Sequence, residues 1–136
     1  MLTALIDYES GNLHSALKAF EKISSENSLG SVTITNDPEI ISNADRLVLP
    51  GDGAFPACKA ALEKSEVFEA LKHAVLAKRR PFLGICVGMQ LMAKKGFEFE
   101  PTNGLNWING QVERIQLDDP SLKIPHMGWN LSLIHI

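Results

Sequence analysis

The sequence predicts an α/β fold of three layers, in which helices flank a mostly parallel sheet. Short apolar runs that suit buried strands alternate with stretches of helical period, and proline or glycine follows several of these runs. With 136 residues, of which 45% are hydrophobic and 21% charged, the chain has the size and composition of one domain with a buried core.

The first half of the chain contains three runs that are typical of buried strands. They lie at residues 2–6, 32–35 and 46–49. After the first run, Asn12 is placed to cap a helix whose apolar residues recur at helical spacing, at Leu13, Ala16, Leu17 and Phe20. Asp37, which precedes a proline, is placed to cap a second helix. Strands and helices therefore alternate, as they do around a parallel sheet.

The second half continues this order as far as residue 95. After the turn at residues 50–53 come two helical stretches, the second with an apolar face made by Val67, Leu71, Ala74 and Val75. Pro81 ends this helix, and residues 82–85 are expected to form a fourth strand. Residues 89–95 are expected to form a short helix.

From residue 96 onward the pattern changes to that of a hairpin. Asn109 and Gly110, which lie between the apolar residues 107–108 and 112–117, are typical of a tight hairpin turn. No repeat, low-complexity segment or interdomain linker interrupts the sequence. The chain is therefore expected to form one domain.

Charge and hydropathy exclude several classes of function. The net charge of −3 comes from interspersed acidic and basic residues, so the sequence lacks the basic stripe that a nucleic acid would need. The apolar run at residues 2–6 is too short for a signal peptide or a membrane span. Two cysteines without a cluster of metal ligands suit a cytoplasmic protein that has reduced thiols and needs no metal or cofactor.

The segment Gly84-Ile85-Cys86-Val87-Gly88 is the feature that points to catalysis. A cysteine between two glycines, at the junction of a strand and a helix, is a cysteine version of the nucleophile elbow. Such a turn holds Cys86 in a strained conformation, and the glycines remove Cβ atoms that would clash. The positive end of the following helix favours a thiolate. The alternative is that Cys86 is a buried, inert cysteine and that the glycines only serve a tight turn.

A second turn, Pro50-Gly51-Asp52-Gly53, follows another strand. The carboxyl ends of neighbouring strands face the same crevice in an open α/β sheet, so this turn can meet the elbow. Its glycines allow backbone N–H groups to be presented without obstruction, which would provide an oxyanion hole together with the N–H of Val87. The alternative is a plain turn without a role in catalysis.

The general base that a cysteine nucleophile needs is harder to identify. His14 and His73 lie on predicted helices and are expected to face solvent. His126 lies in a loop-like segment and His135 is next to the last residue, and neither is followed by an acidic partner. A catalytic triad cannot be completed from these residues, and Cys58 is expected to pack in the core.

Four motifs follow one another along the chain. They are Asp7-Tyr8-x-x-Gly11-Asn12-Leu13, Pro50-Gly51-x-Gly53-Ala54-Phe55, Gly84-Ile85-Cys86-x-Gly88-Met89-Gln90 and Pro125-His126-Met127-Gly128-Trp129-Asn130. The third resembles the elbow of any class I glutamine amidotransferase. The other three resemble motifs of the glutaminase subunits of imidazole glycerol phosphate synthases, a branch of that family. The resemblance covers residues 1–130 and implies the family's flavodoxin-like, three-layer fold.

The resemblance also implies a reaction. Cys86 would attack the side-chain amide of glutamine, so that ammonia and then glutamate leave by way of a glutamyl thioester. Gln90 and Gly53 would contact the substrate. The residues that the resemblance assigns to the oxyanion hole are Gly51, Asp52 and Val87.

A partner subunit is implied as well. In this family the ammonia passes to a (β/α)8-barrel cyclase, with which the glutaminase forms a heterodimer that makes imidazole glycerol phosphate in histidine biosynthesis. The positions that match the subunit interface are Asn12, His126, Met127, Gly128, Trp129 and Asn130. The alternative for these residues is ordinary loop and cap structure.

The chain departs from the family pattern in two respects. Asp52 stands where the family usually has a small apolar residue. The family domain continues past residue 130 with strands that carry the catalytic histidine and its acidic partner, and residues 131–136 do not resemble that continuation. We therefore expect a C-terminally truncated domain at residues 1–130 with an unmatched tail at 131–136, inactive by itself.

Two alternatives stay open at this point. The chain could be a non-catalytic fragment that only binds glutamine or the cyclase, or a different α/β cysteine hydrolase. The missing triad distinguishes a non-catalytic fragment from an active glutaminase. Dependence on a cyclase partner distinguishes a glutaminase from a different cysteine hydrolase.

Overall fold

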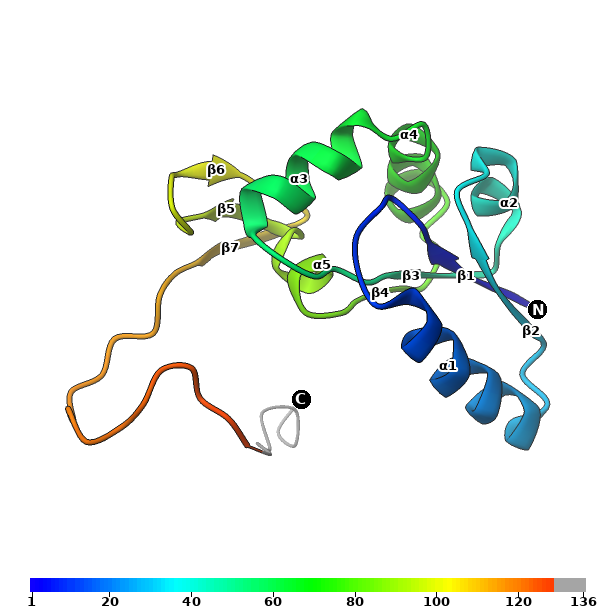
Figure 1. Cartoon of the computed structure of the whole chain (residues 1–136). Coiled ribbons are helices and arrows are strands. Elements are labelled where there is room, and N and C mark those ends of the chain that lie inside the picture. Colours follow the sequence, from blue (N-terminus) through cyan, green and yellow to red (C-terminus); the bar gives the residue numbers. More distant parts are fainter. Residues whose placement is uncertain (129–136) are drawn as a thin grey trace.

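A parallel sheet of four strands forms the centre of the structure, a computed structural model that describes residues 1–128 (Figure 1). The strands lie in the order β2-β1-β3-β4, and every neighbouring pair is parallel. Their bounds are Leu2–Ile6 for β1, Ser31–Thr35 for β2, Arg46–Leu49 for β3 and Phe82–Gly84 for β4. The predicted strands coincide with β1 and β3, and they differ from β2 and β4 by one residue at one end.

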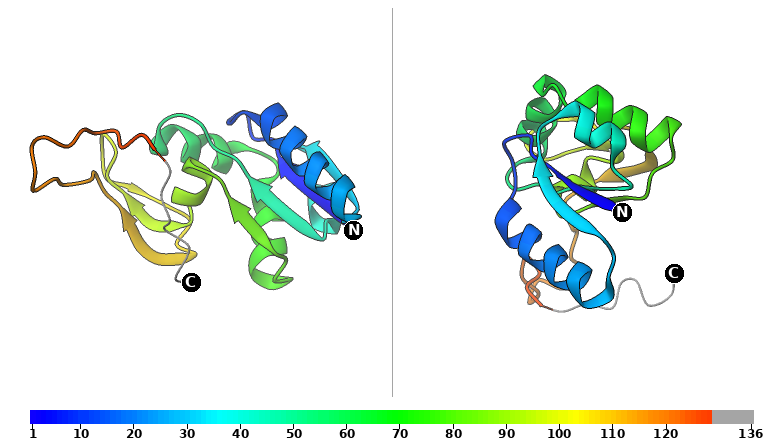
Figure 2. Two further views of the ribbon diagram at one scale, coloured as in Figure 1. Left: turned by 90° about the horizontal axis from the view of Figure 1, so that it is seen from below. Right: turned by 90° about the vertical axis from the view of Figure 1, so that its right-hand side faces the viewer.

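Helices cover both faces of this sheet, which confirms the predicted three layers. Figure 1 shows α1 on one side and α2, α3 and α4 on the other, and the right-hand view of Figure 2 shows the same arrangement. The bounds are Leu13–Asn27 for α1, Pro38–Asn43 for α2, Phe55–Lys64 for α3 and Phe68–Lys72 for α4. Helix α4 continues as a π-helical turn, η1, at His73–Ala77.

Both predicted helix caps are confirmed. The side chain of Asn12 accepts the N–H of Ser15 at 3.2 Å, at the start of α1. The side chain of Asp37 accepts the N–H of Glu39 at 2.8 Å, at the start of α2. These contacts satisfy backbone donors that have no acceptor within the helix.

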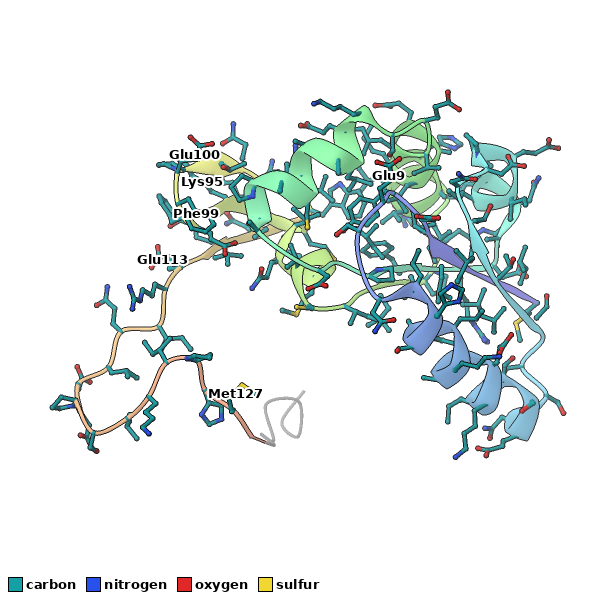
Figure 3. All side chains as sticks on the ribbon, viewed as in Figure 1. Glu9, Lys95, Phe99, Glu100, Glu113 and Met127 are labelled. Atoms are coloured by element: carbon teal, nitrogen blue, oxygen red, sulfur yellow. The ribbon has the colours of Figure 1, made fainter. Side chains whose placement is uncertain are left out.

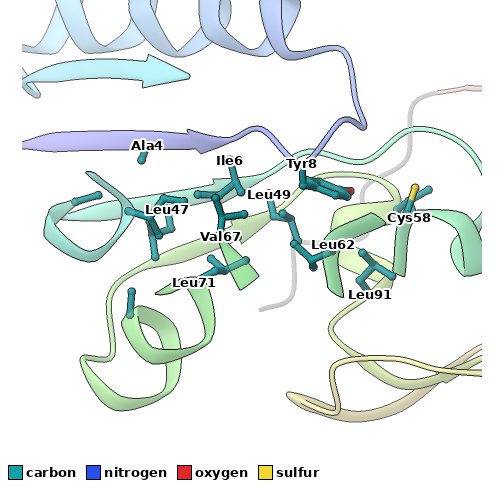
Figure 4. Packing of buried hydrophobic residues seen from close by; sticks show 14 of the residues in the cluster. Ala4, Ile6, Tyr8, Leu47, Leu49, Cys58, Leu62, Val67, Leu71 and Leu91 are labelled. Carbon is teal, nitrogen blue, oxygen red and sulfur yellow. The ribbon is translucent and has the colours of Figure 1, made fainter. Parts of the chain in front are cut away.

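The core lies between the sheet and helices α3 and α4 (Figure 4). Alternate residues of a strand point to the same face, so the inner face carries Ala4, Ile6, Leu47 and Leu49. The side chains packed over them are those of Leu62, Val67 and Leu71. All of these side chains are buried. The predicted apolar helix face is confirmed, since Ala74 is buried as well and Val75 packs against the cluster.

Helix α1 covers the opposite face of the sheet less completely. Its predicted apolar residues, Leu13, Ala16, Leu17 and Phe20, are only half-buried. A hollow of about 280 Å³ lies between this helix and the strands, with Phe20, Val48 and Leu83 in its wall. The more tightly packed core is therefore on the side of α3 and α4.

The prediction of a helix over residues 89–95 is wrong. Helix α5 spans Val87–Gln90 only, and Ala93–Gly96 form strand β5. This strand pairs with β6, Thr102–Asn103, in antiparallel orientation. A partner strand that lies further along the chain thus decides the conformation of these residues, against their helical period.

The prediction of an Asn-Gly hairpin is also wrong. Asn109 and Gly110 lie inside β7, Ile108–Val112, and this strand pairs with β5 in parallel orientation. A second, smaller sheet of order β6-β5-β7 results, beside the elbow. Pairing with β5 outweighs the local preference of Asn-Gly for a turn.

Residues 113–128 follow β7 as an extended segment whose side chains are exposed. Figures 1 and 2 show it leaving the α/β body beyond the small sheet. Within residues 1–128, no helix combines the length and the apolar character that crossing a membrane requires.

A first prediction concerns Tyr8, the sole tyrosine of the chain. This residue is 2% exposed, its hydroxyl donates to the Pro50 carbonyl at 2.8 Å, and burial raises its pKa to about 12. The pKa of a tyrosine in an unfolded chain is about 10. Between these two values the folded chain keeps a proton that the unfolded chain has lost, so the free energy of unfolding should fall as the pH rises through this window.

The measurement is the tyrosinate absorbance of the native chain, followed by urea unfolding at several pH values. Tyr8→Phe is the matched control, because it keeps the ring and should lack this component of the alkaline destabilisation. A native midpoint near that of free tyrosine would contradict the prediction.

Candidate active site

The turns that follow β3 and β4 lie against each other, as the sequence predicted. A Cβ atom on Gly51 would lie 2.5 Å from the backbone nitrogen of Gly88. A Cβ atom on Gly88 would overlap the carbonyl oxygen of Leu49. Both positions require glycine, because a side chain on either would force the two backbones apart. The 50–53 turn and the elbow thus form one unit at the carboxyl edge of the sheet.

Cys86 lies at the tip of the elbow, between β4 and α5. Its φ of 55° and ψ of −121° are values that residues other than glycine adopt rarely and at an energetic cost. The thiol is free and exposed, so Cys86 is not buried as the alternative supposed. The expected strained junction of strand and helix is present, although α5 spans only four residues.

A hollow of about 630 Å³ opens beside Cys86, a volume typical of sites for small molecules. Four of the predicted site residues line it: Gly53, Cys86, Val87 and Gln90. The rest of the wall consists of residues 97–99, which follow β5, and residues 112–114 at the end of β7. Figure 3 shows Phe99 and Glu113 of this wall beside the small sheet. We call this hollow the Cys86 pocket.

Three charged residues of the pocket wall were not identified from the sequence. They are Glu98, Glu113 and Arg114. The Oε2 atom of Glu98 accepts the N–H of Phe55 at 2.7 Å, while Oε1 makes no hydrogen bond within residues 1–128. No spacing in the sequence marks these residues, because they reach Cys86 only through the pairing of β5 with β7.

Polar contacts from side chains outside the wall of the Cys86 pocket fix the 50–53 turn. The Tyr8 hydroxyl holds the carbonyl of Pro50. The N–H of Asp52 donates to Oγ of Ser10 at 3.2 Å, and that hydroxyl donates to the carbonyl of Asp52 at 3.0 Å. The Cys58 thiol donates to the same carbonyl at 3.3 Å. Cys58 is buried, as predicted, and it also stabilises the turn.

These contacts bear on the proposed oxyanion hole. The N–H of Val87 has no backbone acceptor within residues 1–128, and Val87 lines the Cys86 pocket. The N–H of Asp52, in contrast, donates a hydrogen bond to Ser10. Asp52 is exposed, and together with Gly51 it lines a different hollow of about 500 Å³. The assignment of Gly51, Asp52 and Val87 to an oxyanion hole therefore stays a prediction, and Val87 has the more available donor.

The three histidines within residues 1–128 lie away from this site. His14 is exposed on α1, His73 is exposed at the start of η1, and His126 is exposed on the extended segment. None of them lines the Cys86 pocket, whose described walls contain no histidine. His135 lies outside the described residues. The described part of the chain also lacks any group of three His, Cys, Asp or Glu side chains that could hold a metal ion.

The predicted interface residues within residues 1–128 occupy two exposed places. Asn12 caps α1 and lines the same hollow as Gly51. His126, Met127 and Gly128 lie on the extended segment, and Figure 3 shows Met127 well separated from the α/β body. Trp129 and Asn130 lie outside the described residues.

The geometry suits one kind of chemistry. An exposed thiol on a strained turn can attack an electrophilic carbon, and an adjacent backbone N–H can bind the oxygen that becomes negative. The carboxylate and amide groups of Glu98 and Gln90 suit a small polar ligand. The site thus has the geometry that a cysteine nucleophile requires, with an adjoining pocket.

Comparison with known proteins shows the family of the chain. A sequence model of the family described as "Glutamine amidotransferase class-I" matches residues 4–136. The imidazole glycerol phosphate synthase subunit HisH of Ruegeria pomeroyi is 59% identical over 131 residues. The subunits of the same name from Cereibacter sphaeroides and Caulobacter vibrioides are 56% and 51% identical over 131 and 133 residues. In each case the alignment covers 96% of this chain and 62% of the relative.

A second prediction tests the contact between the two turns. Gly88→Ala should lower the free energy of unfolding by at least about 2 kcal/mol, since the added methyl group overlaps the Leu49 carbonyl. Gly110→Ala is the matched control, because a Cβ there meets no atom within 4 Å, and its effect should stay below about 1 kcal/mol. Urea unfolding followed by circular dichroism measures both variants. Equal destabilisation by both substitutions would argue against a tight contact at the elbow.

Proposed function

The chain belongs to the class I glutamine amidotransferase family, and from this premise we propose that Cys86 is the nucleophile of a glutaminase that supplies ammonia for imidazole glycerol phosphate synthesis. The observation that carries the proposal is the exposed thiol of Cys86, held on a strained elbow beside a pocket of about 630 Å³. The three relatives named above support the histidine-pathway assignment by their names. Because the chain spans 62% of their length, the activity and partner of the whole protein are part of the proposal.

The proposed reaction has two stages. The Cys86 sulfur attacks the side-chain carbonyl carbon of glutamine, the carbon–nitrogen bond breaks, and ammonia leaves after its nitrogen receives a proton. Water then attacks the glutamyl thioester, which releases glutamate and returns the thiol. The N–H of Val87 is the best placed donor for the oxygen that carries negative charge in both stages.

The Cys86 pocket has polar groups that match the other end of glutamine. Gln90 and Gly53 line it and are proposed to contact the substrate. The Oε1 atom of Glu98 has no partner within residues 1–128 and is proposed to accept the α-ammonium group. Arg114, at the same wall, supplies the cation that keeps the pocket from being uniformly acidic.

A (β/α)8-barrel cyclase is the proposed partner, in a cytoplasmic heterodimer. The proposed contact residues on this chain are Asn12, His126, Met127, Gly128, Trp129 and Asn130. The exposure of Asn12 and of Met127, which is 84% exposed, supports this assignment. The hollow that Asn12 shares with Gly51 supports a contact close to the catalytic turn.

A second candidate function is binding without turnover. The observation that favours it is that no histidine lines the described walls of the Cys86 pocket. Both steps of the reaction need a proton carrier, so we propose that residues 1–136 alone hold the nucleophile and much of the substrate site but release no glutamate. The remaining alternative, a different cysteine hydrolase, would have an activity that does not depend on a cyclase partner.

A third prediction tests the nucleophile. A limiting amount of a glutamine-shaped chloromethyl ketone should alkylate Cys86 at least about tenfold faster than Cys58, because Cys58 is buried and Cys86 is exposed beside the pocket. Peptide mass spectrometry locates the adduct, and free glutamine should slow its formation. Cys86→Ala should remove the fast reaction. Preferential labelling of Cys58 would overturn the assignment.

A fourth prediction concerns turnover. The chain alone should release no measurable glutamate from glutamine, even with a cyclase and its nucleotide ligand present. Joining the remaining C-terminal residues of the Ruegeria pomeroyi relative should raise the rate by about 10²-fold or more, the typical contribution of a positioned acid–base group. Equal rates for both chains would place the base within these residues, with His126 as the first residue to test.

A further inference from the structure

We infer that Glu98 is a positioning residue that links the Cys86 pocket to the 50–53 turn, in addition to the substrate contact that the proposed function gives it. The inference rests on that proposed function for the identity of the ligand. The contacts between Glu98, Phe55 and Gly96 are independent of the proposed function.

The first contact replaces a missing helix cap. Ala54 occupies the N-cap of α3 and has no side-chain group that could accept a hydrogen bond. The N–H of Phe55, at the start of this ten-residue helix, donates instead to Oε2 of Glu98 at 2.7 Å, across 43 residues of sequence. A carboxylate at a helix N-terminus satisfies an unpaired donor and interacts favourably with the helix dipole. Glu98 therefore holds the start of α3.

The second contact keeps Glu98 and Phe55 in register. Phe55 is fully buried, and a Cβ atom on Gly96 would lie 2.8 Å from its ring. Gly96 is the last residue of β5 and lies two positions before Glu98. A shift of Glu98 must therefore displace the start of α3 or break the hydrogen bond. Since Gly53 is only two residues from Phe55, such a shift would reach the 50–53 turn.

Glu98, which holds the start of α3, differs from the side chains that hold the 50–53 turn. Tyr8, Ser10 and Cys58 fix the carbonyls of Pro50 and Asp52, and none of the three lines the Cys86 pocket. Glu98 alone among these four does line it, and its Oε1 atom is free of hydrogen bonds within residues 1–128. A residue of the pocket wall thus holds α3 with Oε2, while its Oε1 atom makes no hydrogen bond within residues 1–128. Through Glu98, an ammonium group bound in the Cys86 pocket would be connected to the start of α3 and so to the 50–53 turn.

The experiment compares Glu98→Gln with Glu98→Ala in the 136-residue chain. The glutamine side chain keeps an oxygen that can accept the Phe55 N–H but loses the charge, whereas alanine loses both. The readouts are the inactivation constant KI and the maximal rate kinact for alkylation of Cys86 by the glutamine-shaped chloromethyl ketone. Amide hydrogen exchange at Phe55 reports the helix contact independently of any ligand.

Both variants should raise KI about tenfold, because a charge-assisted hydrogen bond to the ligand is lost. Only Glu98→Ala should also lower kinact, by about fivefold, and abolish the protection of the Phe55 amide, as expected for loss of a cap. Asp37→Ala is the matched control, since it removes the cap of α2, far from the site along the chain, and should leave KI and kinact unchanged. Circular dichroism checks that each variant is folded.

Equal kinact values for Glu98→Gln and Glu98→Ala, or unchanged protection of Phe55 in Glu98→Ala, would overturn the positioning role. A different result bears on the proposed function: if Cys86 of the unaltered chain is not alkylated by this reagent, or if glutamine gives no protection, the glutaminase assignment is wrong. In that case the exchange rate of Phe55 in Glu98→Ala still decides whether Glu98 holds the helix.

Discussion

The backbone of Gly88 packs against the Leu49 carbonyl and against Gly51, where any side chain would overlap main-chain atoms. This contact joins the elbow after β4 to the turn after β3, and β3 and β4 are neighbours in the parallel sheet. Cys86 owes its strained conformation to this arrangement, because the chain must leave β4 and start α5 within two residues while its backbone stays against the 50–53 turn. The position of Cys86, the proposed nucleophile, thus depends on Gly51 and Gly88 more than on any hydrogen bond of its own.

Polar groups then fix the 50–53 turn in a way that apolar packing alone would not. The hydrogen bond from Tyr8 to the carbonyl of Pro50 is buried, whereas the carbonyl of the exposed Asp52 accepts hydrogen bonds from Ser10 and Cys58. A buried carbonyl without a partner is costly, so these contacts specify one orientation of each peptide group. Tyr8 both packs in the hydrophobic core and bonds the Pro50 carbonyl. It therefore connects the packing of the sheet to the geometry of the site.

The small second sheet provides the wall that turns an exposed cysteine into a site. Residues 97–99 and 112–114 follow or end its strands and lie beside Cys86. They bring charged groups to a place where the segments that follow the four-stranded sheet contribute only uncharged residues, Gly53, Cys86, Val87 and Gln90. In the proposed glutaminase, the elbow would supply the reacting atom and the wall would contribute to recognition of the amino acid. The proposed role of Glu98 lies at the junction of the two.

The sequence by itself determined the four central strands, both helix caps and the elbow, because each depends on signals that lie within a few residues of one another. The short apolar runs, Asn12, Asp37 and the glycines around Cys86 are such signals. Only the tertiary structure decided that residues 93–96 form a strand and that Asn109 and Gly110 continue one, since the pairing of β5 with β7 joins segments more than ten residues apart. It also decided that Glu98 reaches the Cys86 pocket and that Ser10 engages the N–H of Asp52. Those contacts depend on how distant backbones are brought together, and no local pattern of residues encodes them.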